Sequence, residues 1–261
     1  MSYRNNLVFN ALGLPAYWAE CRRARGKMDV TEEIVRYGPH RRQYAVVVCG
    51  PGSRPDKVAF YFHGGGWTFG RPESFVPAAI PWLELGFTVV LPSYRRPPEV
   101  GLNRIAKDCR AAIAAVLPKG GVTELHVGGI SAGAHLAALA TLKTEWWLAA
   151  GWPAPPSKAL LCAGPLDLGA QFPGFVFGRY AHLDPVTLLN DAMPQKQWLL
   201  LHGTADGLVG YPHSRKFHEK LVALGQEAEL LTLPDGTHLD AGRWMFGGTG
   251  SDAVSTFLRT A

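Results

Sequence analysis

Seven short apolar runs, each of strand length and bounded by Gly, Pro or Asp, constrain the fold of this 261-residue chain more than any other feature. Most of them are followed by a stretch whose apolar residues have helical spacing. Strands that alternate with helices are typical of βαβ units packed around a buried sheet. The expected strands are residues 43–49, 57–62, 88–91, 124–128, 158–161, 197–201 and 229–233.

Four other stretches are expected to be helices. Residues 104–116 carry an apolar stripe at helical spacing, and residues 134–142 are apolar on nearly every side, which predicts a buried helix. Residues 214–224 are interpreted as an outer helix with one apolar face, and residues 251–258 as a short closing helix. A chain of this length favours one large domain over two, so we expect a single α/β domain over residues 1–261.

Three segments are candidates for a small cap or lid, namely residues 1–30, 145–156 and 165–194. The last two interrupt the alternation of strands and helices and are rich in aromatic residues and proline. In open α/β sheets, ligands bind at the carboxyl ends of the strands, where such excursions can form a pocket. Surface loops that merely wrap the core are the competing interpretation.

Charge and composition exclude several classes of partner. The net charge is +5, but the basic residues are dispersed and no nucleic-acid-binding motif accompanies them, so no nucleic-acid partner is expected. No apolar run approaches the ~18 residues of a membrane span, and no convincing signal peptide is present, so the sequence predicts a cytoplasmic protein without a span. The cysteines lack metal or redox spacing and are expected to be reduced and buried; they are Cys21, Cys49, Cys109 and Cys162.

The strongest local motif is Gly-Ile-Ser-Ala-Gly at residues 129–133, directly after an expected strand and directly before an expected helix. A G-x-S-x-G turn of this kind strains the serine backbone and lifts its hydroxyl above the sheet. The flanking glycines are needed because a Cβ there would clash with the neighbouring strand and helix. The pattern therefore predicts a nucleophilic serine, Ser131.

A second motif, His-Gly-Gly-Gly-Trp at residues 63–67, follows the expected strand 57–62. Consecutive glycines let the backbone turn its N–H groups toward a bound oxygen at close range. Together with the N–H of Ala132, those of Gly65 and Gly66 are predicted to form an oxyanion hole. The alternatives are a structural turn or a phosphate cradle, which the absence of G-K-[ST] and G-x-G-x-x-G disfavours.

A serine nucleophile needs a histidine base and a carboxylate that orients it, in the chain order Ser, Asp, His. Asp206 follows the expected strand 197–201, and His238 follows the expected strand 229–233. Both residues therefore fall at the same edge of the sheet as Ser131. We expect Ser131, Asp206 and His238 to form a catalytic triad.

Other aspartates compete for the role of the acid. Asp167 and Asp184 lie in the excursion 165–194 and remain alternatives to Asp206. Two more are too close in sequence to His238 to reach its far ring nitrogen; they are Asp235 and Asp240.

Several histidines have simpler interpretations than catalysis. His202 and Asp206 are four residues apart and in principle share a metal, but a histidine at a strand end is interpreted as packing against backbone. His135 lies on the buried helix and is interpreted as structural. His213 and His218 flank or lie on the outer helix and are expected to be solvated.

Taken in order, these motifs resemble those of the α/β-hydrolase esterases and lipases, in the hormone-sensitive-lipase-like and kynurenine-formamidase-like groups. The resemblance covers residues 44–258 and includes Tyr-Arg-Arg-Pro-Pro-Glu at 94–99 with Asp108. It implies an α/β fold with a mostly parallel central sheet, helices on both faces and a small cap. It also implies that Ser131 is the nucleophile, His238 the base and Asp206 its orienter, with oxyanion donors Gly65, Gly66 and Ala132. The run 101–108 departs from the F-P-A-A pattern that is usual in the family. The resemblance therefore does not define the substrate pocket.

The expected function is hydrolysis of a small or aromatic carboxylic ester through an acyl-enzyme, without a metal or organic cofactor. Trp67 is the predicted substrate contact. Other aromatic side chains either line an apolar pocket or pack in the core; they are Trp146, Trp147, Trp152, Phe172, Phe175 and Phe177.

Two other functions stay open. An amidase that acts on an aryl formamide is one, because Trp67 after three glycines resembles that subgroup. A catalytically silent binding protein on the same fold is the other, because a fold does not fix a function. The expected partner is a small-molecule ester, and a homodimer is left open.

Overall fold

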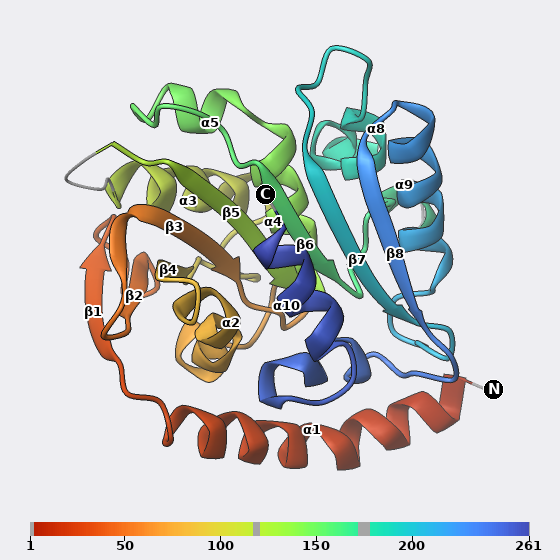
Figure 1. Cartoon of the computed structure of the whole chain (residues 1–261). Coiled ribbons are helices and arrows are strands. Elements are labelled where there is room, and N and C mark those ends of the chain that lie inside the picture. The colour runs from red at the N-terminus through yellow and green to blue at the C-terminus, as the bar shows by residue number, and fades with distance from the viewer. Residues whose placement is uncertain (1–2, 117–120, 172–177, 261) are drawn as a thin grey trace.

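The computed structural model describes residues 3–116, 121–171 and 178–260, and of residues 3–12 the backbone alone (Figure 1). Within them, eight strands form one sheet in the order β1-β2-β4-β3-β5-β6-β7-β8. β1 and β2 pair antiparallel, as do β2 and β4, while every other neighbouring pair is parallel. The strands are β1 (Thr31–Arg36), β2 (Tyr44–Cys49), β3 (Arg54–Phe62), β4 (Phe87–Pro92), β5 (Glu124–Ile130), β6 (Lys158–Cys162), β7 (Gln197–Gly203) and β8 (Glu227–Leu233).

Seven of these strands, β2 to β8, are the seven predicted from the apolar runs, with ends that coincide or differ by at most three residues. β1 was not predicted, and its burial explains why. It is an edge strand whose residues are exposed except for the half-buried Val35, so it lacks the buried apolar face that makes a strand visible in a sequence.

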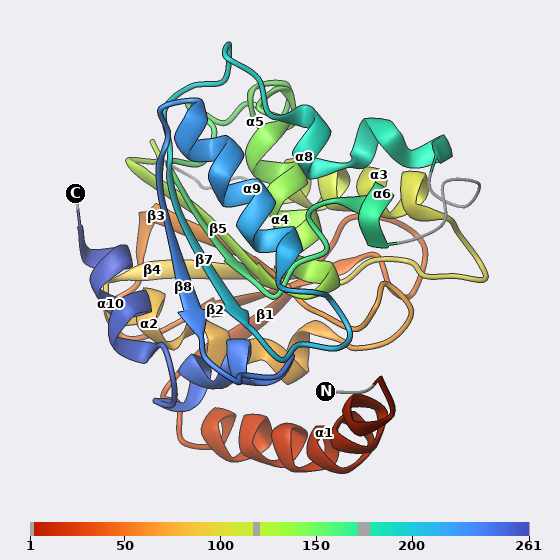
Figure 2. The same ribbon diagram turned by 90° about the vertical axis from the view of Figure 1, so that its right-hand side faces the viewer.

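Helices cover both faces of the sheet (Figure 2). The strands alternate, so that Phe60 and Phe62 of β3 pack into one core layer and Ala59 and Tyr61 into the other. One layer is covered by α3 (Leu102–Ala115), α4 (Ala132–Leu142), α5 (Glu145–Leu148), α8 (Pro185–Leu188) and α9 (Pro212–Ala223). The other is covered by the 3₁₀ segments η1 (Pro72–Ala79) and η3 (Asp240–Phe246), with α2 (Ile80–Leu83) and α10 (Ser251–Arg259). Two short elements complete the path before α8, namely α6 (Leu168–Gln171) and η2 (Gly178–Leu183).

A long N-terminal helix, α1 (Tyr3–Arg25), lies across the η1 and η3 side of the molecule (Figures 1 and 2). Its ring contacts fix it there, with Trp18 edge-on to Phe75 of η1 at 5.2 Å and Tyr17 edge-on to Phe246 of η3 at 5.3 Å. The sequence did not predict this helix, because Pro15 interrupts it and its apolar residues form no clear stripe.

The segment 145–156 lies away from the carboxyl ends of the strands. α4 starts at those ends, and α5 follows the far end of α4, where Trp147 donates its indole N–H to Ala140 O at 2.6 Å. Trp147 and Trp152 both pack edge-on against Phe60 in the core. These tryptophans therefore pack in the core under α3 and α5.

No disulfide joins any of the four cysteines; three are buried, and Cys49 is half-buried. None of the helices in the described ranges is long and apolar enough to cross a membrane.

Candidate active site

The turn between β5 and α4 holds Ser131 in a strained backbone conformation, with φ 57° and ψ −125°. The two flanking glycines have no room for a side chain. A Cβ on Gly129 would lie 2.3 Å from Gly133 O, and a Cβ on Gly133 would lie 2.0 Å from Phe62 O. The N–H of Ser131 donates to Cys162 O of the neighbouring strand β6 at 2.8 Å, which anchors the turn. Strain of about 1–3 kcal/mol is thus held in place by the surrounding backbone.

The glycine loop after β3 lies beside this turn. Gly65 and Gly66 have φ angles of 120° and 54°, and a Cβ on Gly65 would meet Phe69 O at 2.2 Å. Gly65 O accepts the N–H groups of Thr68 and Phe69, both at 2.9 Å. By contrast, the N–H groups of Gly65, Gly66 and Ala132 donate no hydrogen bond to any described residue. They are three donors free to bind an oxygen that carries negative charge.

His63 supports the glycine loop from inside the protein. Its ring stacks on Tyr94 at 4.4 Å with an interplanar angle of 9°, and its Nδ1 lies 2.8 Å from Gly64 O. Complete burial lowers the pKa of His63 to about 3, so the ring is neutral and its Nδ1–H donates to that carbonyl. The place of His63 in the motif is the one signal in the sequence that points to this role.

The predicted base and acid are in direct contact. His238 Nδ1 lies 2.7 Å from Asp206 Oδ2, and the other carboxylate oxygen accepts the N–H groups of Leu208 at 2.9 Å and Val209 at 3.0 Å. Burial by itself would raise the pKa of Asp206, but His238 and His202 outweigh it and hold that pKa well below its usual range. Asp206 is therefore a carboxylate at neutral pH, and it fixes the proton of His238 on Nδ1, which leaves Nε2 as the basic nitrogen.

The competing aspartates are engaged elsewhere. Asp167 pairs with Lys216 and accepts the N–H of Ala170 at 3.1 Å, while Asp184 accepts the N–H of Leu168 at 3.0 Å. Asp240 accepts the N–H and the hydroxyl of Thr237, both at 2.7 Å, and Arg243 Nε at 2.7 Å. Asp235 lies at an exposed turn with φ 54°. Among the described residues, none of these four carboxylates contacts His238.

Four further histidines singled out in the sequence are buried or half-buried. The expectation that His213 is solvated is wrong, because it is 6% exposed and its Nδ1 accepts the N–H of Asp167 at 3.2 Å. His218 is half-buried, with Nε2 3.2 Å from Ala228 O. His135 is fully buried and donates from Nε2 to Leu183 O at 2.8 Å. His202 contacts Asp206, a point taken up below. The described residues contain no group of three or more side chains suited to a metal.

Ser131, His238 and the glycine loop line one cavity of about 420 Å³. Ser131 Oγ and His238 line it without a hydrogen bond between them in the described structure, as is common in enzymes without substrate. Its walls are largely apolar, and no Lys, Arg, Asp or Glu lines the described part of it. The remaining lining residues are Leu14, Tyr17, Trp18, Trp67, Phe69, Phe75, Ile130, Ala132, Pro165, Gln171, Leu208, Val209 and Leu239.

Of the aromatic residues predicted for a pocket, Trp67 lines this cavity. Trp146, Trp147 and Trp152 do not, because they are buried in the core on the α3 and α4 face. Phe172, Phe175 and Phe177 lie outside the described residues. Of the three candidate cap segments, residues 1–30 and 165–194 contribute lining residues and 145–156 contributes none.

A family model described as "alpha/beta hydrolase fold" matches residues 59–172. Esterase B from Lactobacillus rhamnosis has a similar structure, with a TM-score of 0.72 at 18% identity, and the match covers 98% of this chain and 95% of that one. The chain has the α/β-hydrolase fold. A hormone-sensitive lipase from a metagenome library is also similar, with a TM-score of 0.68 at 20% identity and coverage of 99% and 96%.

Curated relatives match this chain over shorter stretches. Kynurenine formamidase of Danio rerio is 32% identical over 122 residues, which are 45% of this chain and 41% of that protein. A probable isoprenylcysteine alpha-carbonyl methylesterase of Oryza sativa subsp. japonica is 25% identical over 217 residues, or 72% of this chain and 52% of that protein. The match thus spans less than half the length of the first of these relatives and about half that of the second.

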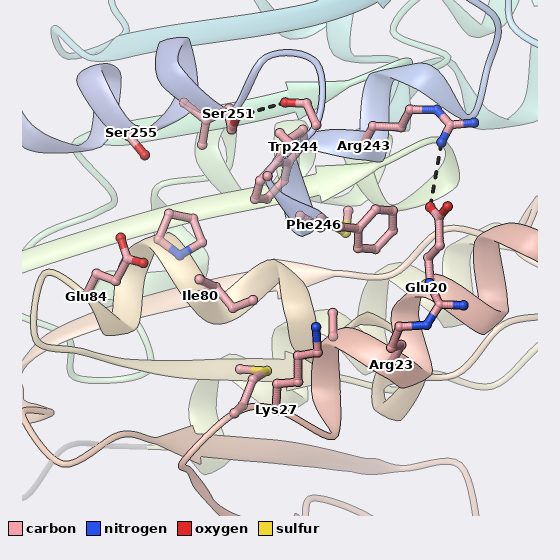
Figure 3. A pocket seen from close by; sticks show the side chains of 17 residues that line it. Glu20, Arg23, Lys27, Ile80, Glu84, Arg243, Trp244, Phe246, Ser251 and Ser255 are labelled. Atoms are coloured by element: carbon pink, nitrogen blue, oxygen red, sulfur yellow. Dashed lines mark hydrogen bonds and ion pairs between the residues drawn. The ribbon is translucent and has the colours of Figure 1, made fainter.

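A second cavity of about 750 Å³ lies between α1, α2, η3 and α10 (Figure 3). Its walls carry both signs of charge, from Glu20, Arg23, Lys27, Glu84 and Arg243, and Arg243 Nη1 lies 3.6 Å from Glu20 Oε2. None of the triad or glycine-loop residues lines it. Its chemistry is therefore distinct from that of the apolar cavity beside Ser131.

Proposed function

We propose that this α/β hydrolase cleaves carboxylic esters through an acyl-enzyme formed on Ser131. The observation that carries the proposal is that three kinds of group meet at one cavity: a hydroxyl on a strained turn, a histidine bonded to a carboxylate, and three N–H groups that donate to no residue in the described part of the chain. Acyl transfer by serine needs all three, and each comes from a different loop.

The proposed reaction has two matching halves. His238 Nε2 takes the proton of Ser131 as Oγ bonds to the ester carbonyl carbon, and the N–H groups of Gly65, Gly66 and Ala132 bind the oxygen that becomes negative. The C–O bond to the alcohol then breaks, and His238 gives the proton to the leaving oxygen. Water repeats the sequence on the acyl-enzyme and releases the acid.

The cavity walls favour an uncharged substrate. A charged group bound there would lose its hydration, and the described walls offer no opposite charge to replace it. Trp67, Phe69 and Phe75 offer faces and edges for an apolar or aromatic group. We therefore propose a small or aromatic ester, with Trp67 as one of its contacts.

An aryl formamidase is the second candidate, supported by the likeness to the kynurenine formamidases over part of the chain. The formyl group is small enough for any acyl site, and an amide would follow the same steps. N-formylkynurenine, however, carries an ammonium and a carboxylate group. The apolar walls beside Ser131 therefore favour the ester.

Replacement of the nucleophile tests the proposal. We expect the wild-type protein to hydrolyse 4-nitrophenyl acetate and a fluorophosphonate probe to label Ser131, and Ser131→Ala to lower kcat by at least about 10⁴-fold. Rates on N-formylkynurenine, measured beside those on the ester, separate the two candidates. Equal rates in wild type and variant would rule out the mechanism, and failure of the probe to label Ser131 would favour a binding protein.

A further inference from the structure

His202, at the end of β7, is fully buried behind the acid of the proposed triad. Its Nε2 lies 2.8 Å from Val209 O and 3.2 Å from Asp206 Oδ2. Its other ring nitrogen, Nδ1, lies 2.7 Å from Ser214 Oγ of α9. The imidazole is therefore held on both sides, and one of its nitrogens faces the carboxylate that bonds to His238.

These contacts decide which nitrogen of His202 carries the proton. A neutral ring with its proton on Nδ1 would turn the lone pair of Nε2 toward two oxygen acceptors, Val209 O and Asp206 Oδ2. A proton on Nε2 removes that repulsion, because one N–H then faces both oxygens, and the hydroxyl of Ser214 donates to Nδ1. His202 is thus a donor toward Asp206.

Asp206 then has donors on every side. Two backbone N–H groups bind Oδ1, and Oδ2 lies between the N–H of His238 at 2.7 Å and that of His202 at 3.2 Å. An aspartate carboxylate held at only one oxygen can still rotate about its Cβ–Cγ bond. The second imidazole fixes Oδ2, which is the oxygen that orients His238.

We propose that His202 is a positioning residue for the hydrolytic reaction. The proposal rests on the proposed function of Ser131, Asp206 and His238. Its N–H holds Oδ2 where that oxygen orients His238, and it takes up part of the negative charge of the carboxylate. This role adds to the expected packing of His202 against backbone, which its contact with Val209 O bears out.

The remaining ionisable groups nearby form a separate cluster. His213 of α9 accepts the N–H of Asp167 at 3.2 Å, and Asp167 pairs with Lys216, so their charges largely offset one another. His238 and His202 are the histidines that contact Asp206. The pH profile of the reaction should therefore respond to His202.

Two amide substitutions separate the two nitrogens of His202. In His202→Gln the amide nitrogen falls near the place of Nε2 and keeps a donor toward Asp206. In His202→Asn the shorter side chain places its amide near Nδ1, where it can bind Ser214 but not Asp206. Both variants are polar and smaller than or similar to histidine, so they disturb packing in similar ways.

We expect His202→Asn to lower kcat/KM by about tenfold, mostly through kcat, since a hydrogen bond to a charged group is lost. The acid limb of its pH profile should move upward by about half a pH unit to one unit, because Asp206 then acts on His238 with more of its charge. His202→Gln should stay within about threefold of wild type with an unmoved limb. His126→Gln is the matched control: this histidine is buried in β5 away from the site, so the variant should lower stability and leave the profile unchanged.

A measurement on the wild-type protein guards against variants that fail to fold. Nitrogen-15 NMR of the histidine rings distinguishes the two tautomers, and we expect His202 to carry a proton on Nε2 at the pH of the assay. A ring whose only proton lies on Nδ1 would overturn the proposal. Rates are expressed per site labelled by the fluorophosphonate, so unfolded molecules do not count.

The outcomes keep the two proposals apart. Labelling of Ser131 and ester hydrolysis in the wild type, with an unchanged profile in His202→Asn, would sink the role of His202 and leave the proposed function standing. A wild-type protein that neither labels nor hydrolyses would sink both. Loss of rate in His202→Asn and His202→Gln alike, with no shift of the acid limb, would show that His202 only packs.

Discussion

At the residue scale, close backbone contacts explain why only glycine fits at the positions that flank Ser131. Gly129 and Gly133 both have φ angles open to any residue, yet a Cβ at either would come within 2.3 Å of a carbonyl oxygen. The turn that strains Ser131 is therefore possible only because β5, α4 and the end of β3 touch backbone to backbone there. The sequence indicated this requirement through the G-x-S-x-G pattern, though not which oxygen fills the space.

Gly133→Ala tests that contact. The added Cβ would lie 2.0 Å from Phe62 O, and backbone cannot move aside as a side chain can. We expect a loss of about 3 kcal/mol or more in the free energy of unfolding, together with loss of esterase activity. Urea denaturation measures the first. Gly52→Ala, where nothing lies within 4 Å of the added Cβ, should change neither quantity; similar effects at both positions would contradict the argument.

Side-chain contacts at the site were less accessible to prediction than motifs. The loops that carry Ser131, Asp206 and His238 were inferred from strand ends, and they meet at one cavity because parallel strands end at one edge. His213 was misjudged. Its burial depends on how α9 packs against other elements, and a sequence shows the spacing along one element but not which neighbour covers it.

At the element scale, prediction succeeded where burial was strong. The fold class is confirmed, and β2 to β8 and four helices follow from their apolar patterns. β1 and α1 were missed because one is almost entirely exposed and the other owes its place to single aromatic contacts. The cap expected from residues 145–156 depended on aromatic content alone, and aromatic content does not distinguish a pocket from a core.

α1 should influence the size of substrate that the protein accepts. Leu14 of α1 lines the cavity, so Leu14→Trp should fill part of its 420 Å³. We expect kcat/KM for 4-nitrophenyl butyrate to fall about tenfold more than that for the acetate, since the longer acyl group needs the lost space. Ala16→Trp, on the exposed side of the same helix, is the control and should leave the ratio of the two rates unchanged. An unchanged ratio in Leu14→Trp would mean that substrates do not reach α1.

At the scale of the whole molecule, three buried histidines link stability to pH. Burial lowers the pKa of His63 and His126 to about 3 and that of His135 to about 4. In the unfolded chain they would titrate near pH 6.5. The folded state therefore binds fewer protons than the unfolded chain. Protonation of these histidines does not lower the free energy of unfolding above pH 6.5, but it lowers that free energy progressively as the pH falls toward 4.

We expect the free energy of unfolding to fall between pH 7.5 and pH 5, by up to about 2 kcal/mol for each such histidine. Asp206 does not contribute in this range, because its pKa is depressed and its carboxylate stays ionised in both states. Urea denaturation at the two pH values measures the fall. His126→Gln should reduce it, and an equal fall in that variant and in the wild type would contradict this origin.

The order of strands has a consequence for when the site can exist. Ser131 and the glycine loop belong to β5 and β3, which are neighbours, whereas Asp206 and His238 belong to β7 and β8 on the far side of β6. β6 supplies none of the three proposed triad residues, so the loops after β5 and β8 must reach across its end to bring Ser131 and His238 to one cavity. While a ribosome makes the chain, the serine turn is complete about a hundred residues before its base. The nascent protein thus carries Ser131 without its proposed base until β8 joins the sheet.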